Sequence, residues 1–489
     1  MIRFASTLLL AAALSSCSLL RPWHTQPDLP ETPPTWTAAS TSKQIFDATA
    51  WRREFADPQL TNLIEEAVGN NFDLRSAAAR VNAARASAVV SGADRIPQIS
   101  ASLNASRAKR ATVVGGTVIS GISNYFQSGI EIRWEADIWG RLSHQARAAT
   151  LELAASEADY QAARLSLAAN ISRAWFNAIE TRQQVELSRQ TVANYRQALE
   201  SIRGRYRSGL NSALDVRLAR SNLASAESQL AAQQLRLDGE LRTLQTLLGR
   251  YPSRQLALAD NLPELQQPVP AGLPADLLTR RPDLNAAQHR LQAADERASQ
   301  AAKDRLPRIQ LTTSGGTSSD QLNSLLEGDR LIWSLVGGIT APLFQGGRLK
   351  ANQQLARANA EQAVNQYAQS LLNAFREVET ALAAAPLLEI RQQALQTAVQ
   401  EARESERLAA EQYRTGLVDI TTWLEAQRRL FNARSNLLQI RNQRLQNRID
   451  LHLALGGDFI TAASSEAVDK SRFATRTLTP GRDSEVAEQ

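Results

Sequence analysis

Few side chains in this sequence have the types and spacing that chemistry requires. Cys17 is the only cysteine, so its thiol is a candidate for modification. The four histidines are scattered along the chain: His24, His144, His289 and His452. None has the close Cys or His neighbours of a zinc site, and no nucleophile elbow, phosphate-binding loop or dinucleotide fingerprint occurs. We therefore expect no enzymatic activity, no cofactor and no resident metal.

The residues around Cys17 indicate what its thiol does. Arg3 precedes an apolar run over residues 8–14, which two serines separate from Cys17. The run is far shorter than the ~20 residues of a membrane-spanning helix and is typical of a signal peptide. Leucine, two small residues and cysteine resemble a bacterial lipobox, which implies acylation of Cys17, while Ser18 in place of Asp implies the outer membrane. The alternative is a signal peptide with a chance cysteine.

Composition limits the class of protein. The 489 residues carry a net charge of +6, and 43% of them are hydrophobic, which is enough for a folded core of one or two domains. Basic chains often bind nucleic acid, but no basic block or aromatic platform is present. We interpret the charge as spread over solvated helix faces and expect no nucleic-acid partner.

The sequence carries one stretch twice, since YRSGL at residues 206–210 returns as YRTGL at 413–417. Each copy ends an unusually long helical pattern, 141–206 or 348–413, and precedes another helix. Other matched pairs are 94–97 with 304–307 and 140–142 with 347–349. The sequence therefore predicts a tandem duplication, in which each half is a helix, a strand hairpin, a very long helix, a tight turn and a helix. Pro386 predicts a kink in the second long helix.

The repeated stretch has the residues of a helix–turn–helix hairpin. Gly209 and Gly416 stand where a helix should end, because glycine accepts the left-handed conformation that closes a last turn. Ser212 with Asp215 predicts a capping box, and Asp419 predicts an N-cap for the last helix.

Four segments alternate in polarity and predict strands: 98–106, 129–136, 309–313 and 333–339. We expect a glycine- and serine-containing loop between the first two, and we place Gly315–Gly316 in the second hairpin loop. Four aromatic residues are expected near strand ends, as in membrane barrels: Tyr125, Phe126, Trp134 and Trp139. A soluble hairpin would look similar, so this pattern leaves both readings open.

Strand number constrains assembly if these strands cross a membrane. Unpaired strand edges are not tolerated in lipid, and four strands cannot close around a lumen. Several chains would then have to share one barrel. No later segment is a candidate transmembrane helix, and the long helices are too polar for lipid, so they would project into water on one side.

Several stretches then carry a family resemblance: FADPQL at 55–60, NFDL at 71–74, GLPADLL at 272–278, RRPDL at 280–284, LEAQR at 424–428 and the two Tyr-x-x-Gly turns. The sequence resembles the TolC-like outer membrane factors, in the lipoprotein branch that works with resistance–nodulation–division pumps. The resemblance implies a mainly α, α+β fold with four transmembrane strands per chain. It implies a homotrimer with a twelve-stranded barrel in outer membrane lipid of a Gram-negative bacterium, a periplasmic helical barrel, a periplasmic adaptor and an inner membrane pump.

The resemblance also implies roles for particular residues. The adaptor would contact the turns at Tyr206, Gly209, Tyr413 and Gly416. An acidic iris that closes the periplasmic end would contain Asp215, Asp419 and Glu425, although Thr422 is neutral where some relatives carry Asp. Three like charges at such a ring would also need Arg or Tyr partners or bound cations, and the candidate partners of Asp419 are Tyr413, Arg403 and Arg407.

The predicted organisation is a signal peptide at 1–16, a lipidated extended tether at 17–50, repeat one at 51–249, a connector at 250–281, repeat two at 282–457 and a polar tail at 458–489. The function that follows is a passive efflux conduit. The alternatives are a structural coiled-coil envelope lipoprotein without a pore and the outer membrane channel of another exporter class. The exported substrate is not readable from the sequence.

Overall fold

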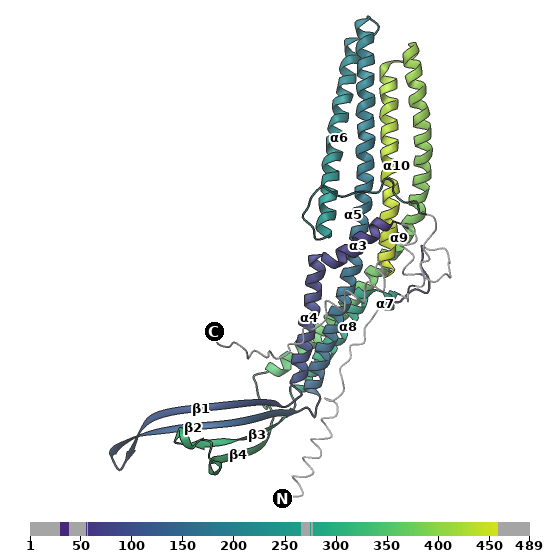
Figure 1. Ribbon diagram of the computed structural model, residues 1–489. Helices are drawn as coiled ribbons and strands as arrows, with labels where there is room; N and C mark the ends of the chain where they lie inside the picture. Colours follow the sequence, from purple (N-terminus) through teal and green to yellow (C-terminus); the bar gives the residue numbers. More distant parts are fainter. Residues whose placement is uncertain (1–29, 39–54, 56, 266–273, 275–276, 458–489) are drawn as a thin grey trace, which may run out of the picture. The chain divides into compact units, whose positions relative to one another are not determined.

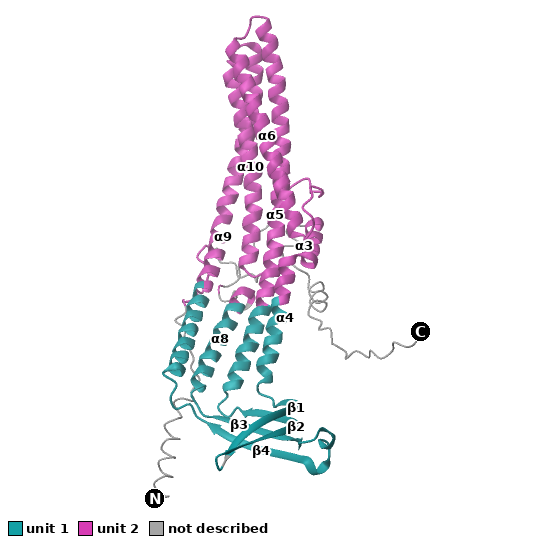
Figure 2. Cartoon of the chain, turned by 90° about the vertical axis from the view of Figure 1, so that its left-hand side faces the viewer, with its two compact units in different colours: residues 1–29, 80–157, 286–369 teal, residues 30–79, 158–285, 370–489 magenta. Residues whose placement is uncertain are grey.

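The computed structural model describes residues 30–38, 55, 57–265, 274 and 277–457. The chain forms two compact units (Figure 2). The described parts of unit 1 lie within Arg80–Glu157 and Ala286–Gln369, and those of unit 2 within Pro30–Ala79, Ala158–Asn285 and Ser370–Gln489. Each unit combines segments of both halves of the sequence, so the predicted repeats and the spatial units divide the chain differently.

Unit 1 contains one antiparallel sheet of four strands in the order β1-β2-β3-β4 (Figure 1). The strands are β1 (Gln98–Val114), β2 (Thr117–Ala136), β3 (Arg308–Ser319) and β4 (Leu331–Thr340). Two short 3-10 helices, Leu322–Ser324 and Gly328–Arg330, connect β3 to β4. The prediction of two strand hairpins, one from each half, is confirmed.

The first hairpin is longer than the sequence suggested. Pairing continues to Val114 opposite Thr117, and only Gly115 and Gly116, both with positive φ, form the turn. The predicted loop between residues 106 and 129 is therefore wrong. Its serines and glycines occupy strand positions because cross-strand pairing overrides their weak strand preference. Tyr125 and Phe126 consequently lie inside β2 rather than at its end.

Gly315 and Gly316 are also strand residues, so their predicted loop position is wrong. Gly316 pairs with Gly129 of β2. A Cβ atom on Gly316 would lie 2.0 Å from the Ser128 carbonyl oxygen and 2.6 Å from Gly129 Cα, whereas one on Gly315 would meet nothing within 4 Å. Gly316 thus permits a close backbone approach between the strands of the two halves.

The helices of unit 1 lead into and out of this sheet. They are the end of α4 (Phe72–Ala93), the start of α5 (Arg141–Arg207), α8 (Pro282–Lys303) and the start of α9 (Arg348–Thr415). Asp137 caps α5, because its carboxylate accepts hydrogen bonds from the amides of Leu142 at 2.9 Å and Ser143 at 2.8 Å. Buried alanines, including Ala298 and Ala360, pack α8 closely on α9.

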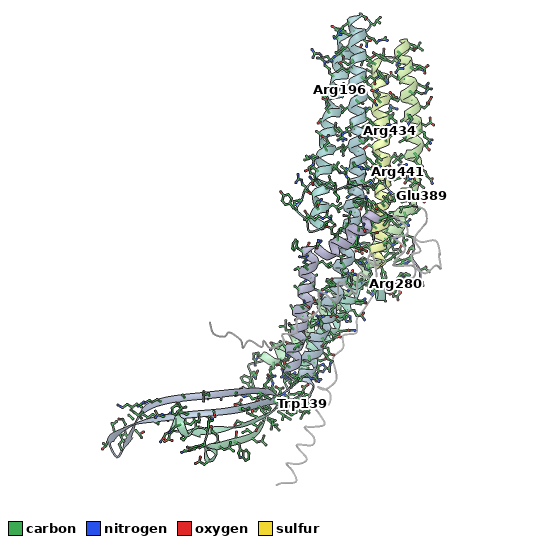
Figure 3. The ribbon with its side chains drawn as sticks, viewed as in Figure 1. Trp139, Arg196, Arg280, Glu389, Arg434 and Arg441 are labelled. Atoms are coloured by element: carbon green, nitrogen blue, oxygen red, sulfur yellow. The ribbon has the colours of Figure 1, made fainter. Side chains whose placement is uncertain are left out.

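Unit 2 is built from long helices. Helices α5 and α9 continue beside α6 (Ala213–Leu247) and α10 (Ile420–Ala454), with the short helices α3 (Pro58–Asn70) and α7 (Leu277–Arg280) (Figure 1). Helix α9 is continuous through Pro386. Arginines are spread along the helices, as Arg196, Arg434 and Arg441 illustrate (Figure 3). Among the described helices, none has the length and apolar content needed to cross a membrane.

Residues 30–38 are docked on unit 2 rather than extended as a free tether. Trp36 is 5% exposed and contacts Phe375 of α9 edge-to-face, with ring centroids 6.2 Å apart. The amides of Thr37 and Ala38 donate to the two carboxylate oxygens of Glu379 at 2.7 and 2.9 Å. The tether prediction is wrong for this segment, because a buried tryptophan offsets the entropy lost on docking. The signal peptide, Cys17 and the tail at 458–489 lie outside the described residues.

Candidate functional site

The two glycine turns end α5 and α9 in the same way. Gly209 has a φ of 74° and Gly416 a φ of 79°, both in the left-handed region. In each turn the following leucine amide donates to a carbonyl five residues earlier, Leu210 to Arg205 and Leu417 to Gln412, both at 2.9 Å. This pattern satisfies carbonyls that a helix end leaves open, and it confirms the predicted helix–turn–helix hairpins.

The two following helices begin differently. Ser212 Oγ accepts from the Asp215 amide at 3.2 Å, and Asp215 Oδ2 accepts from the Ser212 amide at 2.8 Å. The predicted capping box is therefore confirmed. Asp419 occupies the N-cap position of α10, but its side chain accepts no capping hydrogen bond. The prediction was right about the position of Asp419 and wrong about its capping role, because only the Asp419 carbonyl bonds, to the Thr422 amide at 3.1 Å.

Asn211 joins the two hairpins. Its Nδ2 donates to the Tyr413 hydroxyl at 2.8 Å and to Asp215 Oδ2 at 3.2 Å, and its Oδ1 accepts from Arg205 Nε at 3.0 Å. The Arg205 guanidinium also lies 5.2 Å from the centre of the Tyr413 ring. Sequence reasoning missed Asn211 and Arg205. The available signal was that the second repeat has Val418 where the first has Asn211.

The two repeated tyrosines have different surroundings. Tyr413 is 5% exposed and stacks on Trp423 with ring centroids 5.2 Å apart, while Tyr206 is 48% exposed. Trp423 Nε1 donates to Glu406 Oε1 at 3.1 Å, which fixes the indole. Tyr413 therefore belongs to the buried cluster that joins the hairpins, and Tyr206 is available to a partner.

The three acids expected in an iris also differ. The Asp215 carboxylate is engaged in its capping box. Glu425 pairs with Arg429 at 2.9 Å and Arg428 at 2.6 Å, and the hydrogen bonds from these two arginines lower the pKa of its carboxyl. Asp419 is exposed and has no ion pair or side-chain hydrogen bond within the described part of this chain. Only Asp419 presents a free carboxylate here.

Two of the candidate partners of Asp419, Arg407 and Tyr413, have other partners within one chain. Arg407 pairs with Glu404 at 2.6 Å and Glu411 at 3.3 Å, both on α9. Arg403 lies near Arg434: burial is the main cause that lowers the pKa of Arg434, and the positive charge of Arg403 is the next. The Tyr413 hydroxyl is bonded to Asn211. Contacts of Asp419 with these groups around a threefold axis stay a prediction; within one chain, acidic neighbours three and four residues away on the same helix pair with Arg407.

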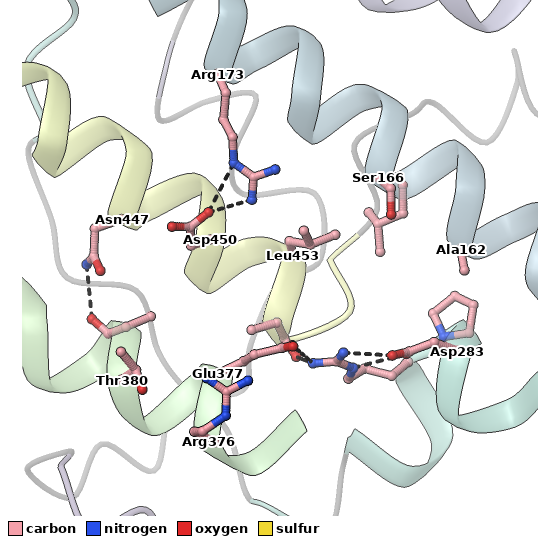
Figure 4. A pocket seen from close by; sticks show the side chains of 15 residues that line it. Ala162, Ser166, Arg173, Asp283, Arg376, Glu377, Thr380, Asn447, Asp450 and Leu453 are labelled. Carbon is pink, nitrogen blue, oxygen red and sulfur yellow. Dashed lines mark hydrogen bonds and ion pairs between the residues drawn. The ribbon is translucent and has the colours of Figure 1, made fainter. Parts of the chain in front are cut away.

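A cleft of about 480 Å³ in unit 2 is a second candidate (Figure 4). Most of its charged side chains are paired: Arg173 lies 2.5 Å from Asp450, and Arg281 lies 2.7 Å from both Asp283 and Glu377. Arg281 also donates to the Ala454 carbonyl at the end of α10. These bonds tie α8, α9 and α10 together. Across the described residues, no group of three His, Cys, Asp or Glu side chains could hold a metal.

Unit 1 contains a buried histidine between α5 and α8. His144 Nδ1 lies 2.5 Å from Glu296 Oε2, its Nε2 contacts the Lys303 ammonium, and Arg147 Nε lies 3.0 Å from Glu296 Oε2. Lys303 can only donate, which favours an unprotonated Nε2, while both the Glu296 carboxylate and Arg147 Nη2, at 2.7 Å, lie against Nδ1. Burial lowers the pKa of His144; Glu296 opposes this, and the charges of Lys303 and Arg147 add to it.

Comparisons with known proteins agree with this architecture. The model of the family "Outer membrane efflux protein" matches residues 63–250 and 273–457. The toluene efflux pump outer membrane protein TtgF of Pseudomonas putida is 32% identical over 465 residues, covering 93% of this chain and 97% of TtgF. The cation efflux system protein CusC of Escherichia coli is 32% identical over 454 residues, covering 91% and 97%. The solved outer-membrane channel OprN gives a TM-score of 0.83 at 26% identity, covering 90% and 99%.

Proposed function

The chain belongs to the outer membrane efflux protein family, and we infer from this membership how its geometry serves transport. It is the outer membrane channel component of a tripartite efflux system, in which a homotrimer works with a periplasmic adaptor and an inner membrane pump. Its location is the outer membrane of a Gram-negative bacterium, with a large periplasmic portion. TtgF and CusC are named for toluene and cation efflux, so we assign no exported substrate to this chain.

The observation that carries the conduit proposal is the open sheet. β1 and β4 are its two edges, and every residue of β4 is exposed in the single chain. Unpaired backbone groups in lipid cost several kcal/mol each, so β1 of one chain should pair with β4 of the next. One face of β1 presents Ile99 and Leu103, each 71% exposed, and the other presents serines. This alternation fits a sheet with lipid outside and water inside.

We propose that the two helical turns receive the adaptor. Leu210 is 68% exposed and Leu417 is 76% exposed, and Tyr206 adds an exposed ring. Large apolar side chains exposed to this degree at helix turns are consistent with a protein-binding site. The glycines Gly209 and Gly416 shape the turns that present these side chains.

We propose a gate in which Asp419 supplies the iris charge and Asn211 holds the hairpins together. Threefold symmetry would place three Asp419 carboxylates around one axis, where like charges need cations or donors from neighbouring subunits. Asp215 and Glu425 have partners within the chain and contribute less to such a ring.

We propose that Cys17 carries a lipid, supported by the lipobox-like residues before it. Cys17→Ala should abolish incorporation of radiolabelled palmitate in growing cells while conductance persists. Ser16→Ala keeps a small residue and serves as the matched control. Palmitate label that persists in Cys17→Ala would refute lipidation at this residue.

The conduit is tested by measuring single-channel conductance of the purified protein in planar lipid bilayers. Cross-linking in detergent should yield a trimer, because one chain brings only four strands. The proposal fails if a monomer conducts, or if trimers insert and never conduct under conditions that open the gate.

A further inference from the structure

The first hairpin extends beyond the rest of the sheet. β2 pairs with β3 only from Phe126 to Ala136. Its pairing with β1 continues from Tyr125 opposite Ser106 to Thr117 opposite Val114. This two-stranded extension, residues 106–125, reaches past β3 and β4 (Figure 1). Its turn lies at the end of the strands opposite to the end where α4 enters and α5 leaves.

The extension carries cations that the chain does not neutralise. Arg107, Lys109 and Arg110 are exposed, and none has a hydrogen bond or ion pair within the described residues. No Asp or Glu occurs from Gln98 to Ile130. Many arginines of the helices, by contrast, pair with carboxylates, as Arg242 does with Asp238 and Arg407 with Glu404. The extension is therefore a surface of uncompensated positive charge.

Strand alternation divides these cations between the two faces. Arg107 and Lys109 continue the row of Ile99 and Leu103, which is the apolar exposed face. Arg110 lies on the opposite face, in the row of the serines. A membrane strand tilted by about 45° crosses the apolar band in about 9–11 residues, and β1 begins at Gln98, so the band ends near residue 107. Arg107 and Lys109 are thus the first charges beyond that band.

We propose that Arg107 and Lys109 bind the phosphate groups of lipids in the outer leaflet that surrounds the channel. This rests on the proposed orientation, in which the helices are periplasmic and the Gly115–Gly116 turn faces outward. The negative phosphates complement the two unpaired cations. The acyl chains of the same lipid molecules would lie against the apolar row of β1 next to these cations. Arg110, on the lumen face, takes no part.

The test uses the detergent-purified trimer and measures its affinity for diphosphoryl lipid A, with dephosphorylated lipid A and inorganic phosphate as further probes. The variant is Arg107→Gln with Lys109→Gln, and Arg110→Gln is the matched control on the other face. A basic residue near an anionic lipid surface strengthens binding about fivefold, so the double variant should bind roughly 25-fold more weakly. Arg110→Gln should bind like the parent.

Three results would overturn the proposal: equal affinity in the double variant and the parent, an equal loss in Arg110→Gln, or equal binding of dephosphorylated lipid A. Inorganic phosphate that competes at the same concentration as the lipid would show a general anion site and would also refute it. Conductance in planar bilayers, measured on the same preparations, reports separately on the channel. A double variant that conducts normally but loses lipid affinity supports the proposal, and a parent that never conducts contradicts the proposed function instead.

Discussion

Replacing Asn211 with alanine should loosen the proposed gate at the two helical turns. Asn211 Nδ2 supplies the hydrogen bond to Tyr413 that connects the first hairpin to the second, and its Oδ1 orients Arg205 over the Tyr413 ring. Alanine removes both. The Tyr413 hydroxyl then stays in a largely buried position without its amide partner.

The size of the effect follows from these contacts. A neutral hydrogen bond contributes about 1 kcal/mol, and leaving a buried hydroxyl unpaired costs about 1–3 kcal/mol in total. A cation–π contact at a partly exposed site adds about 0.5–1 kcal/mol, some of which Arg205 loses with its positioning. We expect about 2 kcal/mol per chain, equivalent to roughly a 30-fold shift towards separated hairpins.

The assay is the fraction of time that single trimers conduct in planar bilayers without adaptor or pump. Asn211→Ala should increase it, and Tyr413→Phe should increase it less. The double variant should not exceed Asn211→Ala, because both changes remove the same bond. Ser208→Ala is the matched control, since the Ser208 hydroxyl bonds only to the Gly204 carbonyl of α5 among the described residues. Additive effects of the two single changes, or an equal effect of Ser208→Ala, would refute the reasoning.

Three further predictions concern other parts of the chain. Gly316→Ala should lower the free energy of unfolding by roughly 3 kcal/mol, because its Cβ atom would meet the β2 backbone. Its trimer yield on semi-native gels should fall, while Gly315→Ala should assemble normally. The lowered pKa of His144 means that the folded state favours the neutral ring. Its contribution to the free energy of unfolding is therefore complete above pH 6.5 and is lost as the pH falls below that value. In thermal unfolding followed by circular dichroism, the stability of His144→Gln should fall less steeply with acid than that of the parent or His289→Gln. Asp419→Ala should raise conductance without adaptor and weaken its inhibition by divalent cations, and unchanged currents in both conditions would remove Asp419 from the gate.

The long elements were predictable because their signals extend over many residues. Alanine- and leucine-rich periodicity and the glycine turns located both hairpins, and the capping box of Ser212 followed from local chemistry alone. The predicted strand ends were wrong where pairing with a neighbouring strand determines the length of a strand. Residues 107–128 mix strong strand formers with glycines, serines and an asparagine, and pairing between β1 and β2 keeps these weak strand formers extended. Gly316 looked like a loop residue because its close approach to Gly129 depends on contact between the two halves.

The position of the candidate site was predictable from the sequence, but the hydrogen-bond partners within it were not. The duplicated turn identified Tyr413 and Gly416, but the bond to Asn211 joins residues that are distant in sequence. The partners of charged side chains are hard to predict for a related reason. Arg407 has acidic neighbours on its own helix, and these compete with any distant carboxylate. The docking of Trp36 was missed because a proline-rich composition indicates extension but does not reveal a pocket for one aromatic ring.

The two copies of the turn have diverged in a way that makes the hairpins unequal. The first copy supplies the polar group, Asn211, where the second has Val418, and the second copy supplies the buried ring, Tyr413, where the first leaves Tyr206 exposed. A partner that engages the exposed Tyr206 and Leu210 therefore acts on the hairpin that carries the amide. Displacing this hairpin would break the Asn211–Tyr413 bond while the Tyr413–Trp423 stack of the other hairpin stays intact. Opening of this kind requires one hairpin to move against the other, which a pair of identical turns would not favour.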